Sequence, residues 1–222
     1  MSARPYRLPP GLASGRLIDR AKRLNFTFDG SAMSGFAGDT LASAVMANGH
    51  RLFGRSFKYH RPRGVVGLGP EEMNALVGVG TGGGHEPNRR ATEVELFQGL
   101  EAVSQNRWPS LAFDIGALSN RLSRFLPSGF YYKTFMWPQK FWKTVYEPLI
   151  RRAAGLGEAS RIADPDSYEH MQVGCDVLVI GAGVSGLAAA RAASSGGARV
   201  IIADEQRRPG GMADIAGGTI EG

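Results

Sequence analysis

The sequence predicts an α/β protein in two parts, an α+β N-terminal part followed by the beginning of a parallel α/β domain. Residues 17–36 carry two short apolar alternations around Asp29-Gly30, which is typical of a tight β-hairpin. The string "GDTLASAVMANG" (38–49) places apolar residues at helical spacing. Further on, "VLVIGAGVSG" (177–186) runs from an apolar strand directly into glycines. At 222 residues the chain is long enough for two domains.

Composition excludes several classes of protein. A hydrophobic content of 43% with 21% charged residues is ordinary for a globular chain. No apolar run approaches the roughly 18 residues of a membrane helix, and the N-terminus lacks the apolar region of a secretory signal. We therefore expect a cytoplasmic protein without a membrane partner. Because Cys175 is the only cysteine, the chain lacks the thiolates for a disulfide framework, a multi-cysteine zinc site or an iron–sulfur cluster.

Positive charge is concentrated in the first third of the chain. Residues 1–64 hold eleven Lys and Arg against three Asp, a net +8 within a total of +6. They include "RSFKYHRPRG" (55–64), whose cations and rings would also suit nucleic acid. However, Phe57 and Tyr59 alternate with polar residues, which favours a strand with one buried face and an exit turn at 61–64. We expect no nucleic-acid partner. We expect these cations, Arg61 and Arg63 among them, to hold the loop against acidic groups of this protein's own assembly or of its cofactors.

The first 98 residues predict an arm and a small domain. Residues 1–15, rich in Pro and Gly, indicate an extended arm. After the hairpin, Asp39 or Thr40 caps a helix that Gly49 ends. The helix turns one face toward a sheet, with Leu41, Ala44, Val45 and Asn48. Strands at 50–57 and 74–80 complete a β-grasp-like domain over residues 16–98.

The glycine-rich string "GVGTGGGHEP" (78–87) lacks the Gly-Lys-Ser/Thr ending of a phosphate-binding loop and indicates a flexible loop. Residues 93–104 indicate a short strand or helix. Residues 99–170 form an aromatic-rich connecting segment and linker. Four prolines break the ring-rich part, 108–150, into short pieces. Its rings form either a core or a surface that docks a partner, and the pattern leaves both open. Residues 153–170 are small and polar, as in a linker.

The most informative stretch is "CDVLVIGAGVSGLAAARAASSGGARVIIADE" (175–205). An apolar strand, Val177 to Ile180, precedes Gly181-x-Gly183-x-x-Gly186, an alanine-rich helix and a second strand ending at Asp204. Strand, glycines, helix and acid together match the fingerprint of dinucleotide-binding domains. In that pattern the first glycine allows a tight turn, the second lets the pyrophosphate approach, and the third lets helix and strand pack closely. The helix N-terminus then faces the pyrophosphate.

The acid at the end of the second strand bears on cofactor choice. Asp204 would bond the adenosine ribose and repel a 2′-phosphate, which favours NAD or FAD over NADP, although Arg207 and Arg208 weaken this argument. Gly210-Gly211 is similar to the second glycine pair of flavoproteins with two dinucleotide domains, so NAD and FAD both stay open. The candidate cofactor-binding residues are Gly181, Ala182, Gly183, Ser185, Gly186, Asp204 and Glu205. Since one βαβ unit cannot bury both faces of a sheet, residues 171–222 predict an incomplete Rossmann-type domain and an N-terminal fragment of a longer chain.

Several long strings together resemble one family. They are "FAGDTLASAVMANG", "RSFKYHRPRG", "GPEEMNALV", "SQNRWPSLAFD", "GFYYKTFMWP", "YEPLIRRAAGLG" and "CDVLVIGAGVSGLAAA". By these the chain resembles the α subunits of bacterial heterotetrameric sarcosine oxidases and related amine dehydrogenases. The resemblance implies a ferredoxin-like β-grasp fold whose cluster ligands would fall at Gly67, Glu72, Ala75 and Thr92. None of these is a thiol, so we expect a scaffold without an iron–sulfur cluster.

The resemblance also implies a function and partners. The α subunit would bind NAD, a partner β subunit would carry FAD and FMN, and γ and δ subunits would complete a heterotetramer. The complex would demethylate the small amine sarcosine to glycine, releasing peroxide and either formaldehyde or methylene-tetrahydrofolate, with tetrahydrofolate bound by a later region of the α chain. The alternatives are a related FAD-dependent amine or amino-acid dehydrogenase subunit and a structural subunit with an empty nucleotide site. A fragment of this length is not expected to be active alone.

No catalytic residue stands out in the sequence. His50, His60, His85 and His170 are scattered without acidic partners at a recognisable spacing. Each is better explained as a surface or hydrogen-bonded residue than as a base, and Cys175 as a small hydrophobic residue beside the first strand of the fingerprint. We expect no metal ligands.

Overall fold

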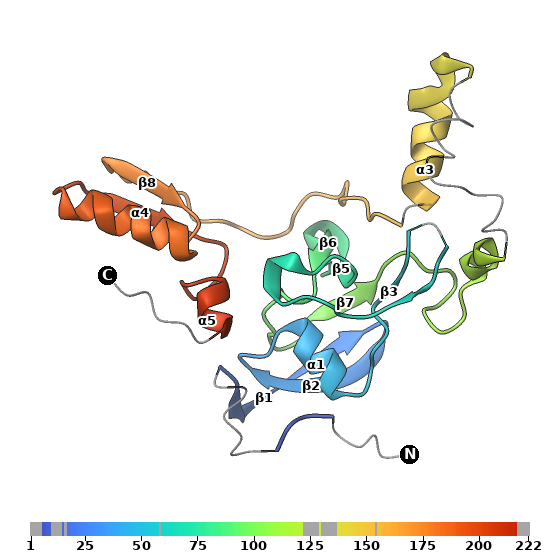
Figure 1. Cartoon of the computed structure of the whole chain (residues 1–222), viewed down its shortest axis with the longest axis horizontal. Helices are drawn as coiled ribbons and strands as arrows, with labels where there is room; N and C mark the ends of the chain where they lie inside the picture. Colours follow the sequence, from blue (N-terminus) through green and yellow to red (C-terminus); the bar gives the residue numbers. More distant parts are fainter. Residues whose placement is uncertain are drawn as a thin grey trace. The chain divides into compact units, whose positions relative to one another are not determined.

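A computed structural model of the chain describes residues 6–9, 15, 17–57, 59–121, 129, 137–153 and 155–216. The chain divides into two compact units, residues 1–166 and 167–222 (Figure 1). The strands and α-helices of the first unit are β1 (Asp19–Phe28), β2 (Ser31–Ala37), α1 (Leu41–Ala47), β3 (Gly54–Arg55), β4 (Pro62–Arg63), β5 (Leu76–Val79), β6 (Glu86–Arg90), β7 (Glu101–Ser104) and α3 (Glu147–Ala153). Those of the second are β8 (Val177–Ile180), α4 (Val184–Ser195), β9 (Val200–Ala203) and α5 (Met212–Ala216).

A five-stranded mixed sheet organises the first unit, in the order β2-β1-β7-β5-β6. Strands β1 and β7 are parallel, and the other neighbouring pairs are antiparallel. One helix, α1, packs against this sheet, which confirms the predicted ferredoxin-like β-grasp fold (Figure 1). The predicted domain end at residue 98 is too early, because β7 lies beyond it and pairs with both β1 and β5.

The predicted hairpin and helix are confirmed in detail. Asp29 (φ 50°) and Gly30 (φ 75°) both adopt positive φ at the tip of the β1–β2 hairpin, the geometry that such two-residue turns require. Thr40 caps α1 by accepting a hydrogen bond from the Ser43 N–H, and Gly49 follows the helix at φ 88°. Of the predicted inward face, Leu41, Ala44 and Val45 are buried. They join a single core with Phe26, Phe28 and Val77 of the sheet and with residues of the connecting segments, namely Phe53, Leu96 and Leu100.

The expected strand through "RSFKYHRPRG" is wrong. The chain reverses direction between β3 and β4, with the Ser56 N–H donating to the Arg61 carbonyl and His60 at φ 51°. Phe57 is 54% exposed rather than buried, and Lys58 lies outside the described residues. Alternation of polar and apolar residues misled here, because β3 pairs with the nearby β4 in a separate two-stranded sheet.

The glycine-rich string 78–87 is also more ordered than the flexible loop that its composition suggested. Gly78 lies within β5, a single 3-10 turn spans Gly82–Gly84, and β6 begins at Glu86. Pairing between β5 and β6 fixes both ends of this connection. The string is therefore a hairpin connection of the sheet.

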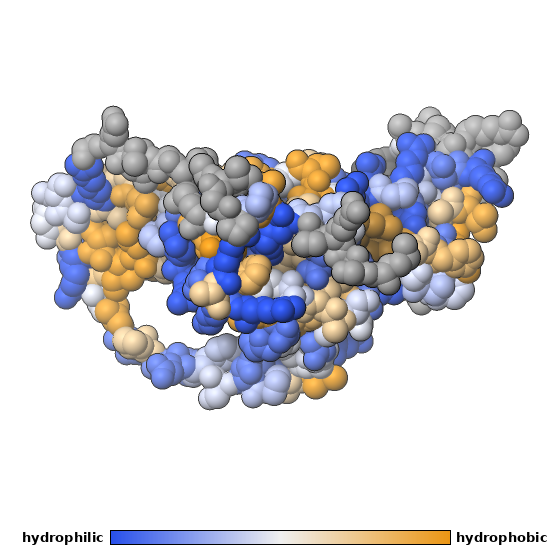
Figure 2. Space-filling model, turned by 90° about the horizontal axis from the view of Figure 1, so that it is seen from below, coloured by the Kyte–Doolittle hydropathy of each residue, from blue (hydrophilic) through white to orange (hydrophobic). Residues whose placement is uncertain are grey.

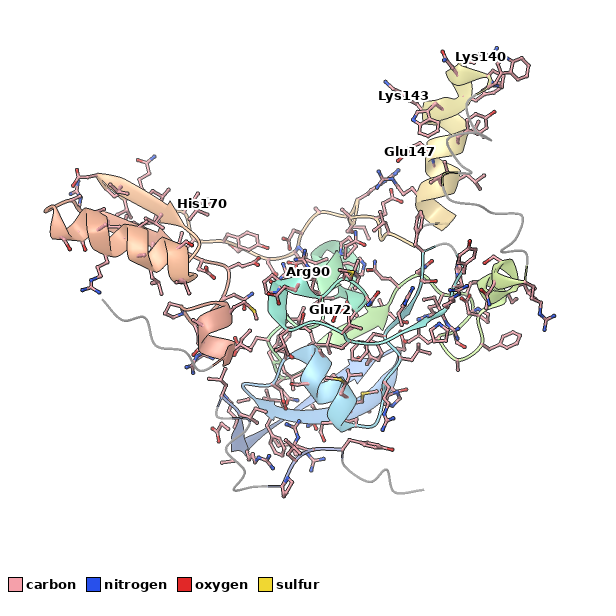
Figure 3. All side chains as sticks on the ribbon, in the orientation of Figure 1. Glu72, Arg90, Lys140, Lys143, Glu147 and His170 are labelled. Carbon is pink, nitrogen blue, oxygen red and sulfur yellow. The ribbon has the colours of Figure 1, made fainter. Side chains whose placement is uncertain are left out.

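The connecting segment contains short helical pieces. They are η3 (Ile115–Asn120), η5 (Gln139–Phe141), the π-helical η6 (Trp142–Tyr146) and α3. Figure 3 shows Lys140, Lys143 and Glu147 along the consecutive helical pieces η5, η6 and α3. Trp108, Phe113 and Trp137 are exposed, so the interpretation of the rings as core is wrong for these residues. The predicted ring-rich string at 130–136 lies outside the described residues.

In the second unit, β8 and β9 form a parallel pair with α4 packed against both strands. An apolar strand of a parallel sheet is ordinarily buried on both faces, but Leu178 and Ile180 of β8 are exposed. Figure 2 shows the resulting hydrophobic surface at the left end of the view, over the elements that Figure 1 labels β8 and α4. The described sheet of this unit has two strands and one covering helix, which cannot enclose an apolar strand.

Candidate dinucleotide-binding site

The fingerprint residues gather at one end of the β8–β9 pair. The strands run in register from Val177 beside Val200 to Ile180 beside Ala203. Since parallel strands end at the same edge, Gly181 and Asp204 emerge together, and the Gly181 N–H donates to the Ala203 carbonyl at 2.7 Å. This carboxyl edge is where open α/β sheets bind their ligands.

The three glycines meet different physical demands. Gly181 has φ 100°, a conformation that side chains rarely adopt. A Cβ on Gly186 would lie 1.9 Å from the Gly181 carbonyl oxygen, so only hydrogen fits between helix and turn. Gly183, by contrast, has nothing within 4 Å of a Cβ position. The first and third glycines are thus needed by the fold, whereas the second leaves open space in front of the backbone.

The open space at Gly183 lies at the start of α4. Gly183 is the N-cap and offers no side-chain acceptor, and the first bond within the helix runs from the Leu187 N–H to the Gly183 carbonyl. The N–H groups of Val184, Ser185 and Gly186 are therefore the first-turn donors that the helix itself does not use. Ser185 is exposed beside them, and Ala182 is buried behind them. Such a terminus attracts a phosphate through its N–H groups and its dipole.

Asp204 is held by the fingerprint loop. Its carboxylate accepts hydrogen bonds from the N–H groups of Ala182 and Gln206. These two donors, Ala182 first, lower the pKa of Asp204 below its ordinary value. Each carboxylate oxygen keeps further lone-pair capacity for a ribose hydroxyl. Glu205 follows directly and is exposed at the same edge. Contact of these acids with a nucleotide stays a prediction.

The second glycine pair packs onto the first. The Gly210 N–H donates to the Ala182 carbonyl at 2.8 Å, and Gly210 forms a bridge with Gly183. Nearby, Arg208 bonds Asp214 of α5 at 3.0 Å, an ion pair that the sequence did not suggest. Because Arg208 is engaged there, it is a weaker candidate for a 2′-phosphate than its position implied. The choice among NAD, FAD and NADP stays a prediction.

In the first unit, the positions that the resemblance linked to an iron–sulfur cluster do converge. Gly67 and Ala75 both donate their N–H groups to the Glu72 carboxylate, and the Thr92 hydroxyl donates to the Gly69 carbonyl at 2.7 Å. None of the four can bind iron as a thiolate, and Cys175 belongs to the other unit. The residues present therefore do not fit a cluster.

His60 has an acidic partner that the sequence did not reveal. His60 Nδ1 lies 2.7 Å from Asp114 Oδ2, an acidic partner 54 positions away. Asp114 also accepts hydrogen bonds from the N–H groups of Trp108 and Gly116, and its Oδ2 lies 4.0 Å from Arg55 Nε. This cluster joins the β3–β4 hairpin to the start of η3. Arg55 and His60 of "RSFKYHRPRG" thus face an acid of the same chain.

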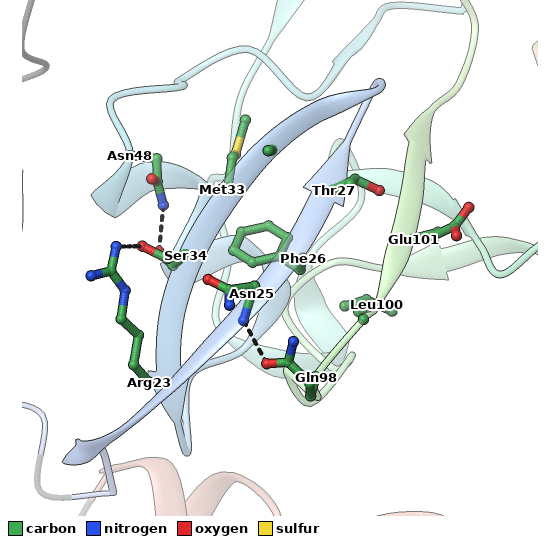
Figure 4. Close-up of a pocket in the computed structure, with 12 residues that line it drawn as sticks. Arg23, Asn25, Phe26, Thr27, Met33, Ser34, Asn48, Gln98, Leu100 and Glu101 are labelled. Carbon is green, nitrogen blue, oxygen red and sulfur yellow. Dashed lines mark hydrogen bonds between the residues drawn. The ribbon is translucent and has the colours of Figure 1, made fainter.

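A hollow of about 610 Å³ lies on the first unit beside β1 and β2 (Figure 4). Its polar side chains already bond neighbouring groups: Arg23 donates to Ser34, Asn48 to the Ser34 carbonyl, and Gln98 accepts from the Asn25 N–H.

No group of three or more potential metal ligands occurs within the described part of the chain. Within the same part, no helix has the length and hydrophobicity to cross a membrane. The fingerprint edge is the candidate site.

Family models match both units. Residues 21–107 match a 2Fe-2S iron–sulfur cluster binding domain, and residues 179–216 match an NAD(P)-binding Rossmann-like domain. Among solved structures, L-proline dehydrogenase from P. horikoshii aligns with 87% of this chain and 26% of its own, at 17% identity and a TM-score of 0.41.

Curated relatives carry a common name. The sarcosine oxidase subunit alpha of Rhizobium meliloti (strain 1021) is 63% identical over 98% of this chain and 22% of its own length. That of Corynebacterium sp. (strain P-1) is 36% identical over 98% of this chain and 18% of its own. The chain thus spans about a fifth of the length of these relatives. With both units matched and the similarity extending over nearly every residue, the chain belongs to the sarcosine oxidase α-subunit family.

Proposed function

We propose that this chain is the dinucleotide-binding part of the α subunit of a sarcosine oxidase complex. The observation that carries the proposal is the open space at Gly183 in front of unused N–H groups of α4. The names of the relatives support the enzyme class. The cofactor proposed here is NAD, with FAD as the alternative.

The residues of the chain would divide the work of binding. The N–H groups of Val184, Ser185 and Gly186 hold the pyrophosphate, and Asp204, with Glu205 beside it, bonds the adenosine ribose. Bound NAD would either accept a hydride or serve as a structural prosthetic group. The described part of the chain shows no catalytic constellation. The resemblance to sarcosine oxidase α subunits supports assigning the oxidation of substrate to the partner β subunit.

The proposed overall reaction is the oxidative demethylation of sarcosine. Sarcosine, oxygen and water yield glycine, formaldehyde and hydrogen peroxide; with tetrahydrofolate in place of water, the methyl carbon leaves as methylene-tetrahydrofolate. FAD and FMN of a β subunit carry the electrons, and γ and δ subunits complete the assembly. Tetrahydrofolate binds to a region of the α subunit outside this chain.

Nucleotide analysis of the natively purified complex tests the proposal. Denaturation should release one NAD per α subunit, or one FAD beyond the share of the β subunit. Gly183→Val should lower the amount of this nucleotide, whereas Gly174→Val, at an exposed glycine outside the fingerprint, should leave it unchanged. A native complex that releases neither nucleotide, and a Gly183→Val complex with unchanged content and activity, would both favour a structural subunit with an empty site.

A further inference from the structure

The side chain of Glu72 is the centre of the loop between β4 and β5, where Figure 3 labels it. The residue is 1% exposed. Its Oε2 accepts hydrogen bonds from the N–H groups of Val66 and Gly67, both at 2.7 Å. Its Oε1 accepts from those of Asn74 at 2.6 Å and Ala75 at 3.1 Å. Four backbone donors from both sides of the loop thus converge on one carboxylate.

This arrangement keeps Glu72 ionised although it is buried. Burial raises the pKa of Glu72, but the four N–H donors together lower it by more than burial raises it. The pKa of Glu72 therefore lies below its ordinary value. Charge-assisted hydrogen bonds of this kind are about twice as strong as neutral ones. The loop is therefore built around a negative charge.

The backbone of the loop is shaped to wrap around that charge. Gly69 has φ 62°, and a Cβ on Gly67 would lie 2.9 Å from the Glu72 nitrogen. The Thr92 hydroxyl closes the far side by donating to the Gly69 carbonyl. Side chains are excluded where the loop turns inward, so that its N–H groups point at the centre.

The same loop lies inside the region that matches a 2Fe-2S binding domain, residues 21–107, yet that region contains no cysteine. A cluster needs thiolates, and its sulfur atoms accept hydrogen bonds from surrounding groups. A carboxylate offers the loop the same two properties, negative charge and acceptor capacity, without any metal. It also engages the four backbone N–H groups that point into the loop.

We propose that Glu72 takes the place of the iron–sulfur cluster as the anionic centre of this domain. The β-grasp domain is then a metal-free scaffold that passes no electrons, and its loop is held by a residue of the chain instead of a prosthetic group. This inference goes beyond the proposed function and does not depend on nucleotide binding in the second unit.

Hydrogen exchange of the full-length α subunit in its complex tests the proposal, read by mass spectrometry on peptides covering residues 65–76. Glu72→Ala removes all four acceptor sites and should speed exchange of this segment by at least about tenfold. Glu72→Gln keeps the volume but places an NH2 group against two N–H donors, so it should speed exchange at one of the two amide pairs. The matched control is Glu71→Gln, at the exposed neighbour, which should leave exchange as in the native protein.

Added acetate separates the charge from a general loss of folding. It should slow exchange in Glu72→Ala by occupying the vacated centre, and should leave Glu71→Gln unchanged. Exchange in Glu72→Ala equal to that of the native protein would overturn the proposal. So would exchange that is fast in Glu72→Ala and unaffected by acetate, because the side chain would then act through packing alone.

Discussion

Glu72 in the first unit and Asp204 in the second both accept hydrogen bonds from backbone N–H groups, but their surroundings differ. Glu72 is buried and satisfies four donors, two at each oxygen. Asp204 is exposed and accepts from two, beside a helix whose first-turn N–H groups are not used by the fold. In the first loop Glu72 accepts from the inward N–H groups, whereas in the second the first-turn N–H groups of α4 remain available for an anion.

The difference separates a structural carboxylate from a binding one. Donors that the chain satisfies internally stabilise the fold and leave no room for a ligand. Donors at an open terminus remain available for a phosphate. Two loops that are both rich in glycine and both shaped by their backbone N–H groups therefore have opposite uses.

The largest effect is expected for Gly186→Val. Its Cβ would meet the Gly181 carbonyl at 1.9 Å, so helix and turn must separate. We expect a loss of about 2 kcal/mol in the free energy of unfolding and no retained nucleotide. Denaturant titration and nucleotide release from the complex measure both. Native stability with bound nucleotide would show that the turn tolerates the side chain.

Gly183→Val should affect binding without affecting the fold. Nothing lies within 4 Å of its Cβ position and its φ of −71° suits any residue, so stability should stay within about 0.5 kcal/mol of the native value. Nucleotide affinity should fall at least about tenfold, because the side chain blocks the approach of the pyrophosphate. Isothermal titration of the nucleotide-free complex is the measurement. A stability loss as large as that of Gly186→Val would contradict the distinction between the two glycines.

Asp204→Asn should have a smaller effect on the same site. The amide oxygen can still accept one N–H, but the charge that repels a 2′-phosphate is lost. We expect NAD to bind about tenfold more weakly than to the native protein. The ratio of NAD affinity to NADP affinity should also be smaller than in the native protein. Competition between the two nucleotides measures the ratio. An unchanged preference for NAD would assign discrimination to another residue, with Glu205 next to test.

The smallest effect is expected from acidification, which should lower the contribution of Glu72 to the stability of the first unit. The pKa of Glu72 is depressed in the folded state, so its contribution to stability is fully present above the unfolded value near 4.5 and is lost as pH falls through the folded value. The native protein should therefore lose its stability advantage over Glu72→Gln as pH falls below about 4.5. Unfolding midpoints of both proteins between neutral and acidic pH are the measurement. A constant difference would mean that Glu72 is not ionised in the fold.

Local sequence patterns predicted the elements that a few neighbouring residues define. The positive φ values at Asp29 and Gly30, the Thr40 cap and the strand–glycine–helix order at residues 177–195 all follow from backbone preferences of adjacent residues. The same patterns failed at "RSFKYHRPRG", where alternation suggested a strand and the chain instead turns back on itself. Alternation reports which side chains could share a face, and carries no information on whether a partner strand is available.

What the sequence by itself determined is the family, the two-part architecture and the nucleotide fingerprint, because each rests on contiguous residues. The tertiary structure decided which polar groups meet: Glu72 with N–H groups on both sides of its loop, His60 with Asp114, and Asp29 with Ser104 and Arg107. Such pairings depend on which segments the sheet brings together. A carboxylate in the sequence has no defined role until burial and its donors are known, and this separates Glu72 from Asp204.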